Sequence, residues 1–449
     1  MENKQLTLKS LLAIALPMII SQASETMMLF ADRLFLSRLG KEFMASAMSG
    51  GLTFFTVVSL FGGIVGYSNA LVAQYYGASR YSKCSQSANQ AIYLSGILYP
   101  VLFISIPLVY LFFSLVGHAP EQITTEFSYF KILMFGSIFF LLRNSFTGFF
   151  LGIGKTKIVM FANIAGMFVN IPANYILIFG KLGLPAMGIE GAAVGTLLGS
   201  FVIFLIQLSV YFSKKYRDLY GTGHEFKIRF DLLRKLLKFG TPAGLETFLN
   251  VGAFNIFIQL MHSYSADIAA AVTITFNYDM VAFIPMIGLS FATTTVIAQQ
   301  MGANNPAGAR LGVRLAMKVG LSYALVMMSF FIFAAEPLVR IFSSGLPGDS
   351  SVIESTAITL LRLASLYTIG DITQLVFAGA LRGAGDTKFV MKVSVIIHWI
   401  FAGLSFFLIK MLVVSPVLMW IFLIFFVLSI GFVLVLRYRS GKWEEIKLI

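Results

Sequence analysis

Acidic and polar side chains that could bind a cation recur inside long apolar stretches of this chain. Asp371 shares one helix face with Tyr367, four residues earlier, and with Gln374, three residues later. On another stretch Glu246 lies about 18 Å from the same membrane face, against about 16 Å for Asp371, and Asn250 follows one turn later. Carboxylate, amide and phenol oxygens suit Na⁺ or a proton. We therefore predict a Na⁺ or H⁺ site at Glu246, Tyr367 and Asp371; alternatively, these groups only hydrogen-bond between helices.

Three further acids lie within apolar stretches, where a charge is costly unless it faces water or a partner. Asp32 either lines a cavity of its own half or pairs with Arg33 or Arg38 at the outer membrane interface, and we favour the cavity. Glu25 lies deeper and is expected to face protein or water. Asp279 has a cavity role or a purely structural one. Arg143 and Lys131 could pair with such acids or extend to the membrane surface, and the sequence leaves both alternatives open.

No catalytic constellation accompanies these acids. Gly154-Lys155-Thr156 is similar to the end of a phosphate-binding loop, but that motif requires glycine at position 149, which here is Phe149. The four histidines are scattered and form no HExxH pair. We therefore expect a protein that is not an enzyme and uses no cofactor besides Na⁺ or H⁺ as a coupling ion.

Composition indicates where the chain resides. Hydrophobic residues make up 58% and charged residues only 12%, whereas soluble domains carry about 25% charged residues. Lipid must cover this much apolar surface, so the chain is expected to be a membrane protein. Its single cysteine, Cys84, excludes an internal disulfide and a cysteine-based metal site.

The apolar stretches position these side chains on twelve predicted spans, each long enough to cross about 30 Å of hydrocarbon. Six precede and six follow one long polar stretch, which we take as a linker at 214–231, between a lobe at 1–213 and a lobe at 232–449. The spans are 8–36, 43–75, 86–115, 126–152, 157–181, 187–213, 234–261, 268–300, 308–334, 352–381, 388–412 and 414–437.

The two halves repeat one another in the same direction. GFFLGIGKTK, starting at Gly148, recurs as GALRGAGDTK, starting at Gly379, 231 residues later. AQYYGA, starting at Ala73, returns as AQQMGA, starting at Ala298, at an offset of 225. The expected fold is therefore all-α, with two pseudo-symmetric six-helix bundles that handle substrate between them.

Basic residues set the orientation. With both termini in the cytoplasm, 24 of the 33 Lys and Arg residues fall on the cytoplasmic side. The net charge of +13 is thus explained by topology, and we expect no nucleic-acid partner. We predict a monomer in the inner (plasma) membrane, in contact with the lipid bilayer and small organic substrates.

Motifs along nearly the whole chain resemble the multidrug and toxic compound extrusion (MATE) family, closest to its NorM-type branch. Pro17, Thr26 and Asp32 match the family pattern in the first span. The longest match, YxxxDxxQxxxxGxLRGxxDT, begins at Tyr367 in the tenth span. The other matching residues are Val72, Gln74, Gly77, Ala78, Arg80, Asn170, Pro172, Asn174, Gly180, Gly188, Gly191, Ala192 and Thr196.

The resemblance implies an antiporter that expels organic, often cationic, compounds in exchange for Na⁺ or H⁺. It places Tyr367 and Asp371 in a cation site of the C-terminal half and gives Asp32 the corresponding role in the N-terminal half. Asn174 and Thr196 match groups that accompany that aspartate in some members.

Three positions depart from the family pattern. The NorM-type glutamate of the seventh span falls at Asn250 here, and the acid stands one turn earlier, at Glu246, a shift of about 6 Å along the same helix face. Glu25 replaces the usual glutamine of the first span. Ile178 stands where members with a fuller N-terminal site carry an acid. These departures concern the identity and number of coupling ions.

We interpret the chain as an alternating-access exporter of cationic or amphipathic compounds. One alternative is a flippase for lipid-linked precursors, which would need a cationic cavity, whereas the candidate cavity residues are mainly acidic. Ion channels usually show symmetric filter loops, and the sequence has no short re-entrant segment. An intramembrane enzyme would need the missing catalytic residues.

We predict that the linker Lys214–Asp231 is cytoplasmic, because the basic bias requires it. In a Cys84→Ser background, Lys227→Cys should react with a membrane-permeant thiol reagent and resist an impermeant one in intact cells. Labelling of that cysteine from outside would contradict this orientation.

Overall fold

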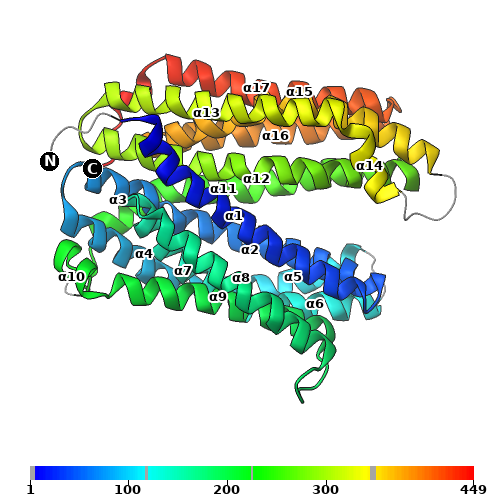
Figure 1. The fold of residues 1–449 in the computed structure, drawn as a ribbon, viewed down its shortest axis with the longest axis horizontal. Helices are drawn as coiled ribbons and strands as arrows, with labels where there is room; N and C mark the ends of the chain where they lie inside the picture. The colour runs from blue at the N-terminus through cyan, green and yellow to red at the C-terminus, as the bar shows by residue number, and fades with distance from the viewer. Residues whose placement is uncertain (1–5, 117–119, 224–225, 344–349) are drawn as a thin grey trace. The chain divides into compact units, whose positions relative to one another are not determined.

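The computed structural model describes residues 6–116, 120–223, 226–343 and 350–449, and all regular structure in these ranges is helical (Figure 1). The elements up to residue 220 are α1 (Leu8–Ser37), α2 (Lys41–Gly66), α3 (Ser68–Gly77), α4 (Tyr81–Leu102), α5 (Ser105–Val116), α6 (Pro120–Phe135), α7 (Ser137–Gly152), α8 (Thr156–Phe179), α9 (Gly188–Tyr211) and α10 (Lys214–Tyr220). Those that follow are α11 (Phe230–His262), α12 (Ala266–Gly302), α13 (Pro306–Phe333), α14 (Ala335–Ser343), α15 (Ser351–Ala384), α16 (Thr387–Lys410), α17 (Pro416–Arg439) and the 3₁₀ helix η1 (Lys442–Glu445).

Nine of the described helices are long and apolar enough to cross a membrane, and two bent pairs raise the number to as many as eleven. α4 and α5 meet at 46°, and α6 and α7 meet at 47°, so the third and fourth predicted spans are broken rather than straight. Pro100 near the end of α4 and Gly136 between α6 and α7 account for the breaks, since proline frees a carbonyl and glycine weakens a helix. The one predicted span outside this number is the seventh, α11, whose polar residues Glu246 and Asn250 lower its mean hydropathy.

Backbone packing divides the chain into two compact units. Unit 1 contains Met1–Ile19, Leu249–Ile297 and Asn305–Lys447. Unit 2 contains Ile20–Phe248, Ala298–Asn304 and Leu448–Ile449. Helices α1, α11 and α12 therefore each contribute residues to both units. The lobe boundaries expected from the sequence, 1–213 and 232–449, stay a prediction.

The predicted linker is partly an ordered helix that packs on unit 2. Tyr216 and Tyr220 of α10 are buried, and both rings pack edge-on against Phe149 of α7. The Ser85 hydroxyl donates to the Tyr220 carbonyl at 2.6 Å. The polar stretch between the two predicted lobes is therefore not a free tether over residues 214–220.

The repeated motif that starts at Gly148 and Gly379 forms the same turn twice. Gly154 and Gly385, 231 residues apart, both adopt a positive φ, of 73° and 102°, after the ends of α7 and α15. The next N–H group, from Lys155 or Asp386, bonds the carbonyl five residues back, at 2.7 Å and 2.8 Å. This bond and the left-handed glycine are typical of a Schellman helix end. The sequence repeat is thus a structural repeat.

The second repeated motif packs against its own copy within unit 2. A Cβ atom on Gly77 would lie 1.9 Å from the Gln299 carbonyl oxygen, and one on Gly302 would lie 1.9 Å from the Gln74 carbonyl oxygen. These four residues are two pairs related by the offset of 225. The contact is therefore reciprocal, as between subunits related by a two-fold axis. Glycine is required at both positions because two backbones meet there.

We predict that Gly302→Ala lowers the free energy of unfolding by about 1–3 kcal/mol, the usual effect of overpacking a tight contact. The matched control is Gly96→Ala in α4, where an added Cβ meets no atom within 4 Å. That change should be neutral or slightly stabilising, since alanine favours helix over glycine. Thermal unfolding in detergent compares the two variants, and equal transition temperatures would contradict the predicted contact.

Candidate cation and substrate sites

In unit 2, the carboxylate of Asp32 is held by donors from two other helices. Asp32 of α1 is buried and accepts hydrogen bonds from Asn174 Nδ2 of α8 and from Thr196 Oγ1 of α9, the latter at 2.9 Å. The described residues show no ion pair between Asp32 and Arg33 or Arg38, its possible interfacial partners. The structure thus brings together the three residues that the family resemblance grouped. Their oxygen atoms could hold a small cation.

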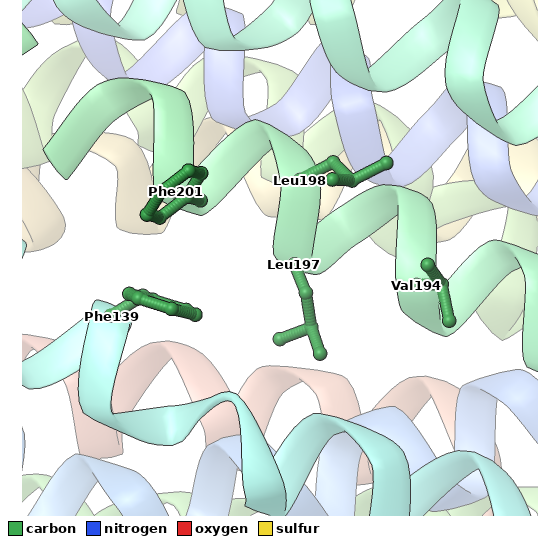
Figure 2. Close-up of a pocket in the computed structure, with 5 residues that line it drawn as sticks. All are labelled: Phe139, Val194, Leu197, Leu198 and Phe201. Carbon is green, nitrogen blue, oxygen red and sulfur yellow. The ribbon is translucent and has the colours of Figure 1, made fainter. Parts of the chain in front are cut away.

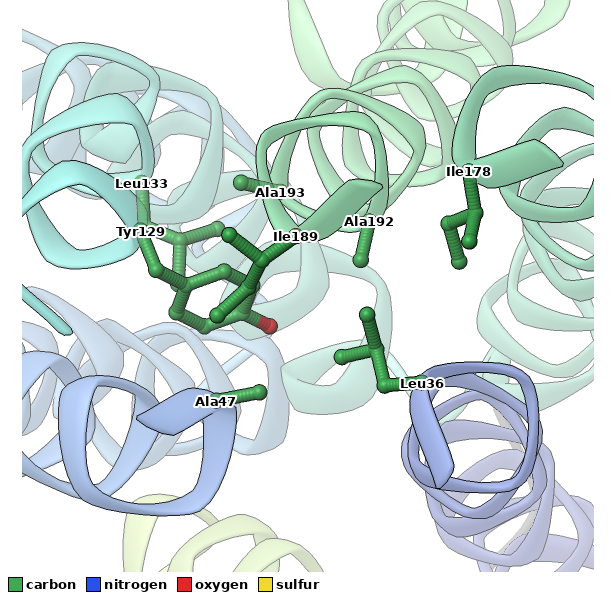
Figure 3. Close-up of a cluster of buried hydrophobic side chains, with 8 residues drawn as sticks. All are labelled: Leu36, Ala47, Tyr129, Leu133, Ile178, Ile189, Ala192 and Ala193. Carbon is green, nitrogen blue, oxygen red and sulfur yellow. The ribbon is translucent and has the colours of Figure 1, made fainter. Parts of the chain in front are cut away.

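An apolar cluster contains residues one helical turn from each of these three side chains (Figure 3). Leu36 follows Asp32 by one turn, Ile178 follows Asn174 by one turn, and Ala192 precedes Thr196 by one turn. Figure 3 shows these side chains and Tyr129 directed toward one another from α1, α6, α8 and α9. Ile178 is therefore a core residue, and the position that is acidic in some family members contributes packing here. Asp32 itself is only 4% exposed, so little water reaches its carboxylate.

The other acid of α1 in unit 2, Glu25, lies seven residues before Asp32 and contacts α7 and α8. Arg143 Nη2 of α7 lies 3.3 Å from Glu25 Oε2, and Asn163 Nδ2 of α8 donates to Glu25 Oε1 at 3.0 Å and to Ser21 Oγ at 2.6 Å. The Arg143 side chain is 11% exposed and the Glu25 side chain 34% exposed. Of the two alternatives left open for Arg143, the structure selects pairing with an acid. Lys131 is exposed on α6.

α8 carries an asparagine face that the sequence reasoning did not recognise in full. Asn163, Asn170 and Asn174 are spaced by seven and four residues, so they share one side of the helix. Asn170 is fully buried, and among the described residues neither of its amide atoms has a hydrogen-bond partner. A Cβ on Gly195 would lie 1.8 Å from Asn174 Oδ1, so α9 approaches this face closely. The helical spacing of three asparagines in an apolar span was the available signal.

In unit 1, Asp371 is joined by an acid that the sequence did not pair with it. Gln374 Nε2 donates to Asp371 Oδ1 at 2.9 Å, as the shared helix face suggested. The buried Tyr367 hydroxyl faces Asp279 of α12, and the carboxyl groups of Asp279 and Asp371 lie within electrostatic reach of each other. Two carboxyl groups and a phenol thus gather in one place.

Glu246 and Asn250 of α11, the seventh predicted span, belong to different units. Asn250 belongs to unit 1, where its Nδ2 donates to Ser394 Oγ of α16 at 2.7 Å. Glu246 is buried and belongs to unit 2. The predicted set of Glu246 with Tyr367 and Asp371 therefore stays a prediction. The described residues contain no group of three His, Cys, Asp or Glu side chains that could hold a metal ion.

Unit 2 also contains an apolar pocket of about 190 Å³ between α7 and α9 (Figure 2). It is lined by Phe139, Val194, Leu197, Leu198 and Phe201, and the two phenylalanine rings meet edge-on at 4.9 Å. No lining residue carries a charge or a hydrogen-bonding side chain. This pocket can accommodate a hydrocarbon group but offers no ligand for a coupling ion.

The model of the MatE family matches this chain twice, over residues 17–176 and 242–406. The chain belongs to the MatE family. The two matches begin 225 residues apart, which is the offset of the AQYYGA repeat. The MATE resemblance inferred from the short motifs is thus confirmed, and the family itself contains the duplication.

Named relatives of this MatE protein include a probable multidrug resistance protein NorM from Shewanella oneidensis, 28% identical over 408 residues, covering 89% of this chain and 86% of that one. Multidrug resistance protein MdtK from Photorhabdus laumondii is 29% identical over 401 residues, covering 87% and 85%. A solved MOP superfamily transporter from Pyrococcus furiosus has a TM-score of 0.89 at 21% identity, covering 98% and 97%. These likenesses confirm a multi-pass membrane protein with twelve spans in two repeats.

We predict that substituting two asparagines of α8 by leucine changes the free energy of unfolding differently. Asn174→Leu removes a donor from the buried Asp32 carboxylate and should lower the free energy of unfolding by about 1–3 kcal/mol. Asn170→Leu removes two amide atoms without partners and should be neutral or stabilising. Thermal unfolding of the purified variants measures both, and equal destabilisation by Asn170→Leu would show that this amide has a partner in the native protein.

Proposed function

We propose that this MatE protein exports organic compounds, cationic or amphipathic, in exchange for Na⁺ or H⁺ by alternating access. The observation that carries the proposal is a buried aspartate carboxyl group in each unit that accepts a hydrogen bond from a side-chain amide. Asp32 has Asn174 and Thr196, while Asp371 has Gln374 and lies near Tyr367. The relatives named NorM and MdtK, described as multidrug resistance proteins, support the export of drugs.

An acid held by neutral donors is suited to reversible cation binding. Asn174 and Thr196 stabilise the Asp32 anion without neutralising its charge, so the carboxylate can still take up Na⁺ or a proton. In unit 1, the proximity of Asp279 to Asp371 concentrates negative charge, which attracts a cation or a proton. We propose Asp32, Glu246, Tyr367 and Asp371 as the coupling residues.

Exchange follows if the coupling ion and the substrate cation compete for the same carboxylates. A bound Na⁺ or proton then disfavours bound substrate, and loss of the ion favours it, which couples the two fluxes. We propose Na⁺ at Glu246, Tyr367 and Asp371, with H⁺ as the alternative ion. Glu25, Asn174, Thr196, Asn250, Asp279 and Gln374 would line the substrate path.

We further propose a monomer in the inner membrane, with both termini in the cytoplasm, as the distribution of basic residues suggests. The alternative of a lipid-precursor flippase would call for free positive charge to hold a diphosphate. The buried arginine Arg143 is already paired with Glu25, so this feature does not favour that alternative.

The test is transport of a fluorescent organic cation, rhodamine B ethyl ester, by protein in liposomes with an imposed Na⁺ or pH gradient. Asp371→Asn should lower gradient-driven transport by at least about tenfold, because asparagine has the shape of aspartate but cannot carry its charge or proton. Asp218→Asn, on the exposed face of α10, is the matched control and should transport like the wild-type protein. Unchanged ion dependence in Asp371→Asn would exclude this role.

A further inference from the structure

We propose that the apolar pocket between α7 and α9 holds an acyl chain of a membrane phospholipid, which packs at the bend between α6 and α7 (Figure 2). The pocket belongs to unit 2 and has a volume of about 190 Å³. This role goes beyond the proposed export of organic compounds and does not depend on the coupling ion.

The pocket arises because an unbroken helix packs along a bent span. α6 and α7 meet at 47°, whereas α9 is one continuous helix that contacts both of them. Near its start, Ala193 belongs to the same apolar cluster as Tyr129 of α6. Nearer its end, the ring of Phe204 lies 5.9 Å from that of Phe146 of α7. A helix that follows both arms of a bent span leaves a gap beside the bend.

The residues at the bend confirm that the pocket lies there. Gly136 separates α6 from α7, and a Cβ atom on it would lie 2.0 Å from Leu197 Cδ2 of α9. Phe139, three residues after Gly136, lines the pocket, and its ring meets that of Phe201 at 4.9 Å. The backbone of the bend therefore touches α9 directly, and the unfilled space lies next to this contact.

The pocket lies at hydrocarbon depth and opens toward lipid. Val194 and Phe201 follow the start of α9 by six and thirteen residues, about 9 Å and about 20 Å along the helix. The hydrocarbon core is about 30 Å thick. Leu198, at the pocket, is 40% exposed, and Leu205, seven residues later on the same face, is 38% exposed. The pocket is thus continuous with the surface that this membrane protein presents to lipid.

The lining decides what occupies the pocket. Its five side chains contain only carbon and hydrogen, whereas a bound water needs two to four polar partners. A site for a polar organic compound also carries polar groups that orient its ligand, and none is present among the lining residues. Lipid tails are as apolar as leucine, so an acyl chain can enter without losing a hydrogen bond.

An occupant also completes the packing of unit 2. Protein interiors contain few voids larger than a water molecule, because atoms that face a void lose their dispersion contacts. A larger side chain at Val194 could fill the gap, but the chain carries valine there. Since a ligand that binds only the native state stabilises it, the acyl chain should raise the stability of unit 2 with the bend in place.

The first experiment measures thermal unfolding of the purified full chain in digitonin, a steroid-based detergent without an alkyl chain. Dioleoyl phosphatidylcholine should raise the unfolding temperature of the wild-type protein, whereas glycerophosphocholine, the same headgroup without acyl chains, should not. Leu198→Trp places a larger side chain at the pocket and should lose most of this rise. Leu205→Trp is the matched control, since it changes an equally exposed leucine of α9 outside the pocket, and it should keep the rise.

An equal rise in Leu198→Trp and Leu205→Trp would overturn the proposal, and so would a rise produced by glycerophosphocholine. If Leu198→Trp does not fold, Val194→Phe takes its place with the same expectation.

The second experiment needs no variant and identifies the occupant. The wild-type protein is placed in liposomes that contain a phosphatidylcholine with a diazirine in one acyl chain, and cross-linked residues are mapped by mass spectrometry. Labels should concentrate on Val194, Leu197 and Leu198 rather than on Leu205, and excess rhodamine B ethyl ester should not remove them. Displacement of the label by this dye would assign the pocket to transported compounds and overturn the proposal. An even distribution of label along α9 would also overturn it.

Discussion

A buried carboxylate inside a membrane needs hydrogen-bond donors, and in unit 2 the donors to Asp32 require three helices to pack together. Its two donors come from α8 and α9, so three helices must meet at one point. Gly195 makes this possible, because any side chain there would collide with Asn174. Leu36 and Ile178 then close one side with apolar contacts. Packing and chemistry are therefore set by the same few residues.

The two acids of α1 in unit 2, Asp32 and Glu25, differ in the charge of their partners. Asp32 has neutral donors and keeps its charge available for a cation. Glu25 has a guanidinium partner, so its charge is already balanced. The helix α1 thus carries two acids seven residues apart, one with neutral donors and one in an ion pair.

The internal duplication accounts for the backbone turns and close helix contacts, but not for which positions carry charged side chains. The repeat preserves a left-handed turn at Gly154 and Gly385 and a reciprocal contact between Gly77 and Gly302, where backbone geometry leaves no alternative to glycine. At the ionic positions the copies have diverged, and Arg143 corresponds to Gln374. Backbone contacts constrain both halves equally, whereas a polar side chain needs only its local partners, so the two halves could acquire different charges.

The sequence by itself determined the all-helical membrane fold, the repeat and the set of residues that carry charge at depth. These follow from composition and from spacing along single helices, and the family motifs added the grouping of Asp32 with Asn174 and Thr196. The tertiary structure decided that Arg143 pairs with Glu25, that Asp279 lies near Asp371, and that two spans bend. Helical periodicity fixes which residues share a face of one helix. The rotation and approach of neighbouring helices depend on side-chain volumes and glycine contacts far apart in the sequence, and only the folded chain shows which faces meet.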